Sequence, residues 1–407
     1  MDFSNLESMK DEILLKALSN SLFKTNYSFD EGIEWNEVFE ESRKQAVCSL
    51  VFDGLGSNAN ISKELSDKWF TYAMMYLKNN ITVNANHSFL DKLMKKHGIS
   101  YCILKGTASE FYYPNPSLRA MGDVDFIVPK ESFEKASEIL IEEGFSMEGE
   151  EHICHRVFKK GKIHLEMHFE PAGMPEGENR KNLEEYFEDI FQKASFVTLE
   201  GVQFENPSPF HHGLIMLLHT YHHLLSEGVG LRHLCDWAVF VNSFTNEEFV
   251  EIFEEKLCRA GLWKFSRILS ATAWNYIGLP YREWIGDVDK TLCKDVISDI
   301  FAGGNFGNKE KSRVQQGAMI SDRGKNGVKK NKLIQLINYK NQQAAKYHPF
   351  FQKHPIFYPF GFVFLAVRYT VYIITGKRKA LNIAALTAGA EKRKNIYMQF
   401  GLFEKED

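Results

Sequence analysis

The sequence predicts an α+β protein in which a small mixed sheet is embedded between two helical regions. Apolar residues recur at helical spacing before residue 98 and again after residue 206. Between these regions, short runs rich in Val, Ile and Phe alternate with polar residues, as strands do. We therefore expect four parts: a helical N-terminal region (1–97), an α/β core (98–206), a helical domain (207–300) and a basic loop with C-terminal helices (301–407).

Composition limits the class of protein. A chain of 407 residues is long enough to bury a sizeable core and to form two or three domains. The six cysteines include no Cys-x-x-Cys pair, which argues against zinc and against a disulfide framework. The first residues lack the charged and then apolar pattern of a signal peptide, so we expect a reducing cytoplasm.

The stretch from Leu104 to Val128 contains the strongest chemical signal. Asp123 and Asp125 lie two residues apart in a run rich in Val, Ile and Phe, so they should share one face of a strand. Two ionised carboxylates repel each other and are best tolerated when they share a cation. Oxygen ligands of this kind suit Mg²⁺, or Mn²⁺ in its place. A pair of solvated aspartates at a strand end is the alternative.

Phosphate-binding features precede this pair. Residues 101–104 form a short apolar run, which predicts a strand, and Lys105-Gly106-Thr107 follows it. Gly106 permits close approach of a ligand to the backbone, and a helix that begins near Thr107 would present free N–H groups to a phosphate. Lys105 adds a positive charge at the same place.

Further strands follow the aspartate pair. We expect a helix over residues 131–143, a strand near Phe145 and a hairpin of residues 153–158 and 163–169. In the last strand Glu166 lies on the polar face. It can therefore join the two aspartates as a third carboxylate, and three carboxylates on one sheet face form a two-metal site for phosphoryl or nucleotidyl transfer.

These motifs resemble those of the bacterial uncharacterised nucleotidyltransferase family, within the superfamily typified by DNA polymerase β. The resemblance covers residues 101–242, and it departs from the superfamily where Gly106-Thr107 replaces the usual Gly-Ser. The matching residues are Leu104-Lys105-Gly106, Tyr113-Pro114, Arg119, Gly122-Asp123-Val124-Asp125, Glu166-Met167-His168, Leu218-His219 and Leu231–Trp237.

The resemblance implies an enzyme that moves a nucleoside monophosphate from an NTP to an unidentified hydroxyl or phosphate acceptor by a two-metal mechanism. It implies Asp123, Asp125 and Glu166 as the catalytic and metal-binding residues. Small-molecule, protein and nucleic-acid acceptors all stay open, and the alternative function is a non-catalytic nucleotide-binding or membrane- or partner-docking protein. The residues expected around the substrate are Lys105, Gly106, Thr107, Arg119, Gly122, His168, Arg232 and Asp236.

Two pairs of residues in the helical domain leave alternatives open. Arg232 and Asp236 lie four apart, so they can pair with each other, or Asp236 can orient Arg232 toward a phosphate. His219 and His223 have the same spacing, which suits a metal ion but is also common among ordinary helix residues.

The C-terminal part of the chain is strongly basic. Residues 309–394 contain 18 Lys and Arg against three acidic residues, within a chain of net charge −4. This segment predicts either a contact with a polyanion or a peripheral contact with a membrane, or else a solvated basic face. Residues 301–333, rich in Gly and Lys, predict a long flexible loop. The apolar residues 355–375 predict a buried or interfacial helix, because Arg368 opposes a membrane span.

Overall fold

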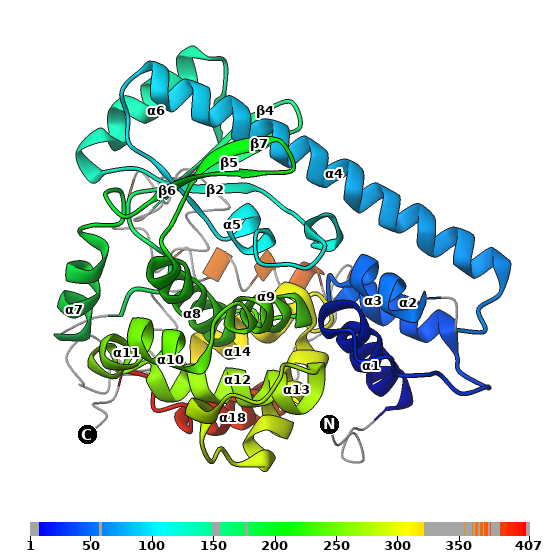
Figure 1. Ribbon diagram of the computed structural model, residues 1–407. Coiled ribbons are helices and arrows are strands. Elements are labelled where there is room, and N and C mark those ends of the chain that lie inside the picture. Colours follow the sequence, from blue (N-terminus) through cyan, green and yellow to red (C-terminus); the bar gives the residue numbers. More distant parts are fainter. Residues whose placement is uncertain are drawn as a thin grey trace. The chain divides into compact units, whose positions relative to one another are not determined.

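The computed structural model describes residues 8–56, 59–148, 155–175, 178–320 and 383–403, together with residues 354, 360, 363, 364, 367, 368, 370–372 and 375. The chain divides into two compact units, Met1–Arg313 with Asn395–Asp407, and Val314–Lys394. The first unit contains the sheet and every candidate site residue (Figure 1). The four domain ranges expected from the sequence stay a prediction.

The N-terminal helices pack around the indole of Trp69. This side chain is fully buried, its Nε1 donates to the carbonyl of Cys48 at 3.0 Å, and its ring lies 5.3 Å from that of Phe39. The longest helix begins where the hydroxyl of Ser62 accepts a hydrogen bond from the backbone N–H of Leu65. The helices are α1 (Met9–Phe23), α2 (Trp35–Lys44), α3 (Cys48–Leu55) and α4 (Lys63–Lys96).

A mixed sheet follows, and it confirms the expected α+β class. The described residues form a five-stranded sheet in the order β1-β2-β5-β4-β3, in which β2 and β5 are parallel and the other neighbours are antiparallel. Its elements match the expected strands and the expected hairpin closely. They are β1 (Cys102–Leu104), β2 (Val124–Ile127), β3 (Ser146–Glu148), β4 (His155–Lys160) and β5 (Ile163–His168).

The two faces of this sheet differ in polarity. Val124, Phe126, Leu165 and Met167 are fully buried and pack with apolar residues of α4 and of α6 (Phe133–Glu142). Because side chains alternate along a strand, the residues between them point to the opposite face. In Figure 1 the helices α8 (Pro209–Leu225) and α9 (Leu231–Asn242) lie on that opposite side of the sheet from α4.

Short elements connect and complete the core. Residues 195–206 form two antiparallel strands, because Glu200 and Gly201 between them both have positive φ (48° and 83°) and form a tight turn. These elements are α5 (Gly106–Glu110), η2 (Pro116–Leu118), η3 (Lys130–Ser132), α7 (Glu178–Phe187), β6 (Ser195–Leu199) and β7 (Val202–Asn206).

The helical part continues beyond α9 and keeps its regular structure further than expected. Within the range where the sequence predicted a flexible loop, residues 305–307 and 313–320 are helical, and bends and turns connect them. The elements after α9 are α10 (Asn246–Phe249), the π-helical turn η4 (Val250–Glu254), α11 (Glu255–Ala260), α12 (Trp263–Ile277), η5 (Glu283–Ile285), α13 (Lys290–Gly303), η6 (Asn305–Gly307) and α14 (Arg313–Ile320).

The glycines of this segment allow close packing. A Cβ atom on Gly303 would approach the Arg313 guanidinium to 2.7 Å. That guanidinium is buried and paired with Asp299 at 2.8 Å, and the hydroxyl of Tyr397 donates to the same carboxylate. The Gly-rich composition was therefore wrongly interpreted as flexibility over residues 305–320. Residues 321–333 lie outside the described part of the chain.

The second unit is described only in part. Within it, Arg393 of α18 (Ile383–Met398) donates to the side-chain oxygen of Gln316 at 3.2 Å, and both side chains are buried. Most of the apolar run 355–375 lies outside the described residues, so its expected interfacial helix stays a prediction. In the part of the chain that was described, no helix combines the length and apolar character needed to cross a membrane.

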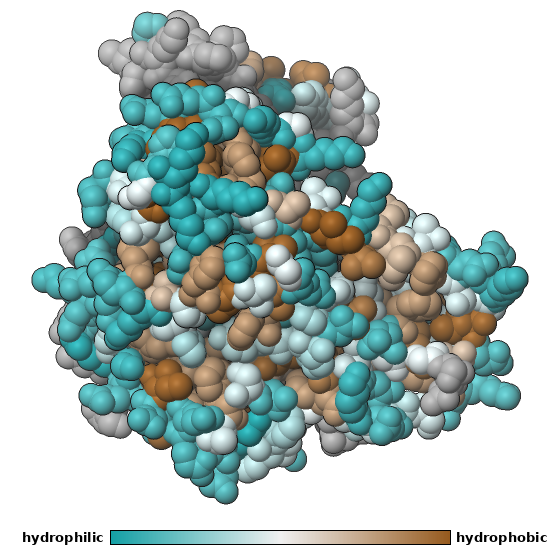
Figure 2. All heavy atoms as spheres, turned by 45° about the horizontal axis from the view of Figure 1, so that its top comes forward, coloured by the Kyte–Doolittle hydropathy of each residue, from teal (hydrophilic) through white to brown (hydrophobic). Residues whose placement is uncertain are grey.

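Surface polarity is ordinary on the face that can be seen. Figure 2 shows that hydrophilic side chains predominate there and that hydrophobic ones form limited patches between them. Isolated apolar residues are common on protein surfaces.

A buried ion pair joins the α/β core to the helical domain. Arg119, which follows η2, donates Nε and Nη2 to the two carboxylate oxygens of Asp236 on α9, both at 2.8 Å. The hydroxyl of Tyr113 donates to the same carboxylate at 2.6 Å. All three side chains are less than 10% exposed. This network therefore places α9 opposite the polar face of the sheet.

Removing this carboxylate should destabilise the fold, because it leaves a buried guanidinium without its counter-charge. We expect Asp236→Asn to lower the free energy of unfolding by about 3–5 kcal/mol, and Tyr113→Phe by about 1 kcal/mol, in urea titrations. The exposed pair Lys193–Asp189 supplies the control, since Lys193→Ala should change stability by less than about 1 kcal/mol. Equal effects of Asp236→Asn and Lys193→Ala would contradict this assignment.

Candidate active site

The polar face of the sheet opens into a cavity of about 640 Å³. Strands β2 and β5 supply one wall, and α8, α9 and Phe306 supply the other. Its size falls in the range of small-molecule sites, about 300–1,000 Å³. Residues predicted from the sequence that line it are Lys105, Gly106, Arg119, Gly122, Asp123, Asp125, Glu166, His219, His223, Arg232 and Asp236.

The parallel pairing of β2 with β5 brings the carboxylates together. Asp125 and Glu166 are direct neighbours in the register, and Asp123 immediately precedes β2. Partial burial and repulsion from Asp125 raise the pKa of Asp123. Burial would also raise the pKa of Asp125, but Lys105 and His168 outweigh it and hold that pKa well below its usual range. The arrangement therefore concentrates negative charge that a cation would stabilise.

A cationic side chain of the protein lies within this cluster. The Nζ of Lys105 is 2.8 Å from Oδ1 of Asp125, and both side chains are largely buried. Lys105 has φ 52°, in the left-handed region that residues with a Cβ seldom adopt. Strained backbone of this kind persists where the surrounding structure enforces it.

Two histidines complete the cluster. The Nε2 of His168 lies 3.1 Å from Oε1 of Glu166 and 3.5 Å from Oδ1 of Asp125. His155, directly opposite His168 in the β4–β5 hairpin, has its Nε2 3.6 Å from the same glutamate oxygen. Among the described residues, His155, Glu166 and His168 form the one group of three such side chains whose ligand atoms all lie within 4.8 Å of one another. Carboxylates and imidazoles at these separations fit a divalent cation.

His155 was not predicted from the sequence, although the signal was present. The hairpin turns between Lys160 and Ile163, so counting back an equal number of residues on each side pairs His155 with His168. His168 was predicted from the sequence as a residue near the substrate. The register of the hairpin was not counted there, so its neighbour His155 was not found.

The side chain of Thr107 points away from the cavity. Its side chain is fully buried, and its hydroxyl is 2.6 Å from Nε2 of His87 on α4, so it does not face the cavity. The helix that begins there, α5, extends over five residues only. Gly106, with φ 32°, does line the cavity. The Thr107 hydroxyl therefore lies away from the cavity, and the expected place of Thr107 beside the substrate stays a prediction.

The pairing of Asp236 differs from both alternatives that the sequence left open. The sequence left open whether Asp236 pairs with Arg232 or orients it, but Asp236 holds Arg119. Arg119 therefore forms a structural ion pair with Asp236 at the cavity wall. Arg232 donates Nη1 to the carbonyl of Ala120 at 3.2 Å and lies over the ring of Phe306. Within the described part of the chain its buried Nε has no hydrogen-bond acceptor.

The helical wall is rich in histidine. The Nε2 atoms of His219 and His223 are 2.9 Å apart, and Nδ1 of His223 is 3.0 Å from a carboxylate oxygen of Glu227. Burial lowers the pKa of His219 and of His233, which stacks on it, so both rings are neutral near pH 7. The contact between His219 and His223 is that of an ordinary hydrogen-bonded helix pair.

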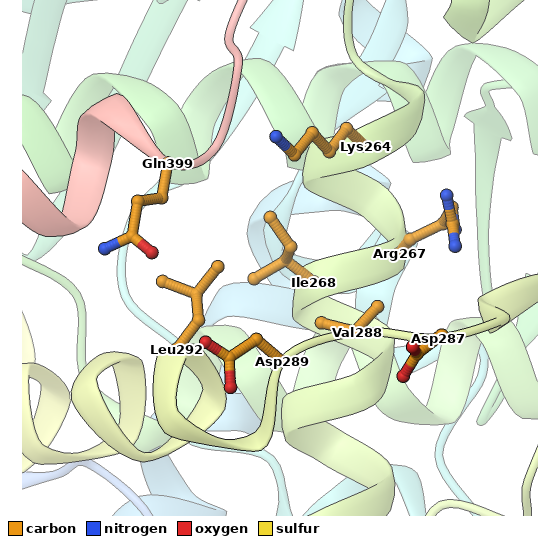
Figure 3. A pocket seen from close by; sticks show the side chains of 8 residues that line it. All are labelled: Lys264, Arg267, Ile268, Asp287, Val288, Asp289, Leu292 and Gln399. Carbon is orange, nitrogen blue, oxygen red and sulfur yellow. The ribbon is translucent and has the colours of Figure 1, made fainter.

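Another cavity, of about 360 Å³, lies away from the sheet between α12 and the start of α13. Figure 3 shows Arg267 and Asp287 on one side of it and Gln399, Leu292 and Asp289 on the other. Its charged groups are of mixed sign. The large cavity beside the sheet, with its carboxylate wall, is therefore the stronger candidate for a reaction site.

The comparisons with known proteins assign the family. A family model described as an uncharacterised nucleotidyltransferase matches residues 31–275. The chain belongs to this family. The match confirms the resemblance seen in the motifs of the α/β core, and it extends from α2 into α12. Membership of this nucleotidyltransferase family indicates nucleotidyl transfer and an NTP substrate as the general activity.

Other comparisons add little. No curated protein matches the chain. The crystal structure of an antigenic nucleotidyltransferase-like protein from Paracoccidioides brasiliensis shares 15% sequence identity. The similarity covers 39% of this chain and 73% of that chain, with a TM-score of 0.27. A likeness of this size carries no weight in the assignment.

A buried acid behind the site was also not predicted from the sequence. Glu110, the last residue of α5, is fully buried, and among the residues that the structure describes neither of its carboxylate oxygens has a hydrogen-bond partner. Burial raises the pKa of Glu110 to about 7, against the opposing charge of Arg119. This carboxyl is therefore protonated in mildly acidic solution, whereas the pKa values of Asp125 and Glu166 on the cavity wall are lowered.

Glu110 should make stability depend on pH. Because its pKa is raised on folding, its favourable contribution is complete below the ordinary value of 4.5 and is lost as the pH rises to about 7. We expect wild type to lose about 3 kcal/mol of unfolding free energy relative to Glu110→Gln across this window, in urea titrations at several pH values. Glu138→Gln, at an exposed position on α6, controls for removal of a charge. Parallel pH profiles for wild type and Glu110→Gln would refute the buried-acid assignment.

Proposed function

We propose that this protein transfers a nucleoside monophosphate from an NTP to a hydroxyl or phosphate acceptor, with release of pyrophosphate. The observation that supports the proposal best is the register of β2 and β5. It brings Asp125 beside Glu166, with Asp123 two residues away, on the wall of a cavity large enough for a nucleotide. Family membership supports the same general reaction.

The carboxylates would form the metal-binding side of the reaction. Asp123, Asp125 and Glu166 would hold Mg²⁺, or Mn²⁺, which supplies positive charge to the phosphates when bound. Glu166 would also accept the proton of the attacking hydroxyl. It lies beside His168, whereas its neighbour Asp125 is the carboxylate paired with Lys105. Lys105 would contribute a further positive charge next to Asp125.

Arg232 would hold the phosphates from the helical wall. Burial and repulsion from Arg119 lower its pKa, so a neighbouring anion would be stabilising. Its Nε, which has no hydrogen-bond acceptor among the described residues, is free to donate to a phosphate oxygen. Guanidinium groups recognise phosphate with strong, charge-assisted hydrogen bonds. The sequence placed both Arg119 and Arg232 around the substrate, and in this proposal Arg232 is the one that contacts the phosphates.

The first test is transfer of label from each α-³²P NTP with Mg²⁺, with cell extract as the source of acceptor. We expect Asp123→Asn to lower the transfer rate by at least about 100-fold, because it removes charge from the reacting site. Asp67→Asn, an exposed substitution on α4, should leave the rate unchanged. Binding of NTP without transfer in any extract would favour the non-catalytic alternative, and transfer by Asp123→Asn at the wild-type rate would exclude the proposed site.

The second test separates nucleotide binding from turnover. Arg232→Gln should weaken NTP binding by about 10- to 100-fold in equilibrium titrations, the loss expected for charge-assisted hydrogen bonds. Arg267→Gln provides a matched control, since Arg267 lines the separate cavity of Figure 3. Equal NTP affinity of wild type and Arg232→Gln would remove Arg232 from the site.

A further inference from the structure

The cluster of His155, Glu166 and His168 has the geometry of a coordination site. Its ligand atoms all lie within 4.8 Å of one another. The distances from Oε1 of Glu166 to Nε2 of His168 and of His155 are 3.1 and 3.6 Å. Four ligands at about 2.1 Å from a tetrahedral ion are about 3.4 Å apart, so the observed distances are those of ligands around one ion.

His168 supplies an independent observation that points to a ligand at this cluster. Its side chain is 1% exposed, yet neither of its ring nitrogens has a hydrogen-bond partner among the described residues. The contact of Nε2 with Glu166, although 3.1 Å long, therefore lacks hydrogen-bond geometry. The Nε2 of His168 lies 3.1 Å from Glu166 and 3.5 Å from Asp125 without hydrogen-bond geometry to either, although buried polar groups are nearly always hydrogen-bonded. A cation bound at this cluster would accept the lone pair of Nε2 of His168.

The donor set selects the class of metal. Mg²⁺ prefers oxygen ligands, whereas imidazole nitrogen favours zinc, iron and related first-row ions. Two histidines and one carboxylate form a set that leaves a coordination position open for water or substrate. The lack of a Cys-x-x-Cys pair in the sequence argues only against zinc sites with sulfur ligands. This cluster is therefore poorly suited to Mg²⁺ and well suited to a transition metal.

We propose that His155, Glu166 and His168 bind one transition-metal ion of the Zn²⁺ or Fe²⁺ type beside the aspartate pair. The site shares Glu166 with the proposed Mg²⁺ ligands, while Asp123 and Asp125 keep the oxygen-rich position. The proposal does not rest on nucleotidyl transfer, because binding of this metal can be measured without turnover.

The test uses the full chain, stripped of metal and titrated with Co²⁺ as a coloured substitute. We expect one Co²⁺ per chain with the intense visible bands of a four- or five-coordinate ion. His155→Gln, at a half-buried position, should weaken Co²⁺ binding by at least about 100-fold, more than loss of an outer-shell group costs. His164→Gln is the matched control, because His164 lies on the same strand, two residues from Glu166 and outside the cluster. Far-ultraviolet circular dichroism checks that each variant is folded.

Two further measurements separate the metals and the functions. Metal analysis of the freshly purified protein distinguishes zinc from iron as the native ion. Asp123→Asn should retain the Co²⁺ spectrum while losing transfer, so failure of the proposed reaction and failure of this site are distinguishable. Weak octahedral Co²⁺ bands, displacement of Co²⁺ by an equal concentration of Mg²⁺, or unchanged binding in folded His155→Gln would each overturn the proposal.

Discussion

The parallel pairing of β2 with β5 is the constraint on which the rest of the structure depends. It places Val124 and Leu165 in the core under α4, and it brings Asp125 beside Glu166 on the opposite face. A shift of either strand by one residue would exchange its two faces. Carboxylates would then enter an apolar core, at a free-energy cost that no other contact of the sheet could offset. Stability and the candidate chemistry thus select the same register.

Charge is divided unevenly between the two walls of the cavity. The strand wall carries carboxylates near Lys105, whereas the helical wall carries His219 and His233, which burial keeps neutral, and Arg232, whose Nε has no acceptor among the described residues. A triphosphate with divalent cations fits between them, because the cations would meet the carboxylates while phosphate oxygens meet Arg232. The Arg119–Asp236 pair keeps the walls at this separation without adding net charge.

The sequence predicted what depends on local pattern. Alternation and turn residues located β2, β4 and β5, and from them the neighbourhood of Asp125 and Glu166 followed. The partners of Asp236 and Thr107 did not follow, because they come from elements distant in the chain: Arg119 is 117 residues away from Asp236, and His87 lies on another helix. The glycines near residue 303 were misinterpreted for a related reason. A Gly-rich segment can be flexible or can allow close packing, and the contact with Arg313 that decides between the two is not visible in the composition.

The long separation between Arg119 and Asp236 also bears on the order in which the protein is built. Contacts between residues this distant form late, because the intervening chain must first be closed into a loop. During synthesis β2, which follows Asp123, and β5, which carries Glu166, leave the ribosome well before α9. A nascent chain would therefore present its acidic strand face uncovered for a time. Chaperones or divalent ions that meet it at that stage would encounter one half of the cavity alone.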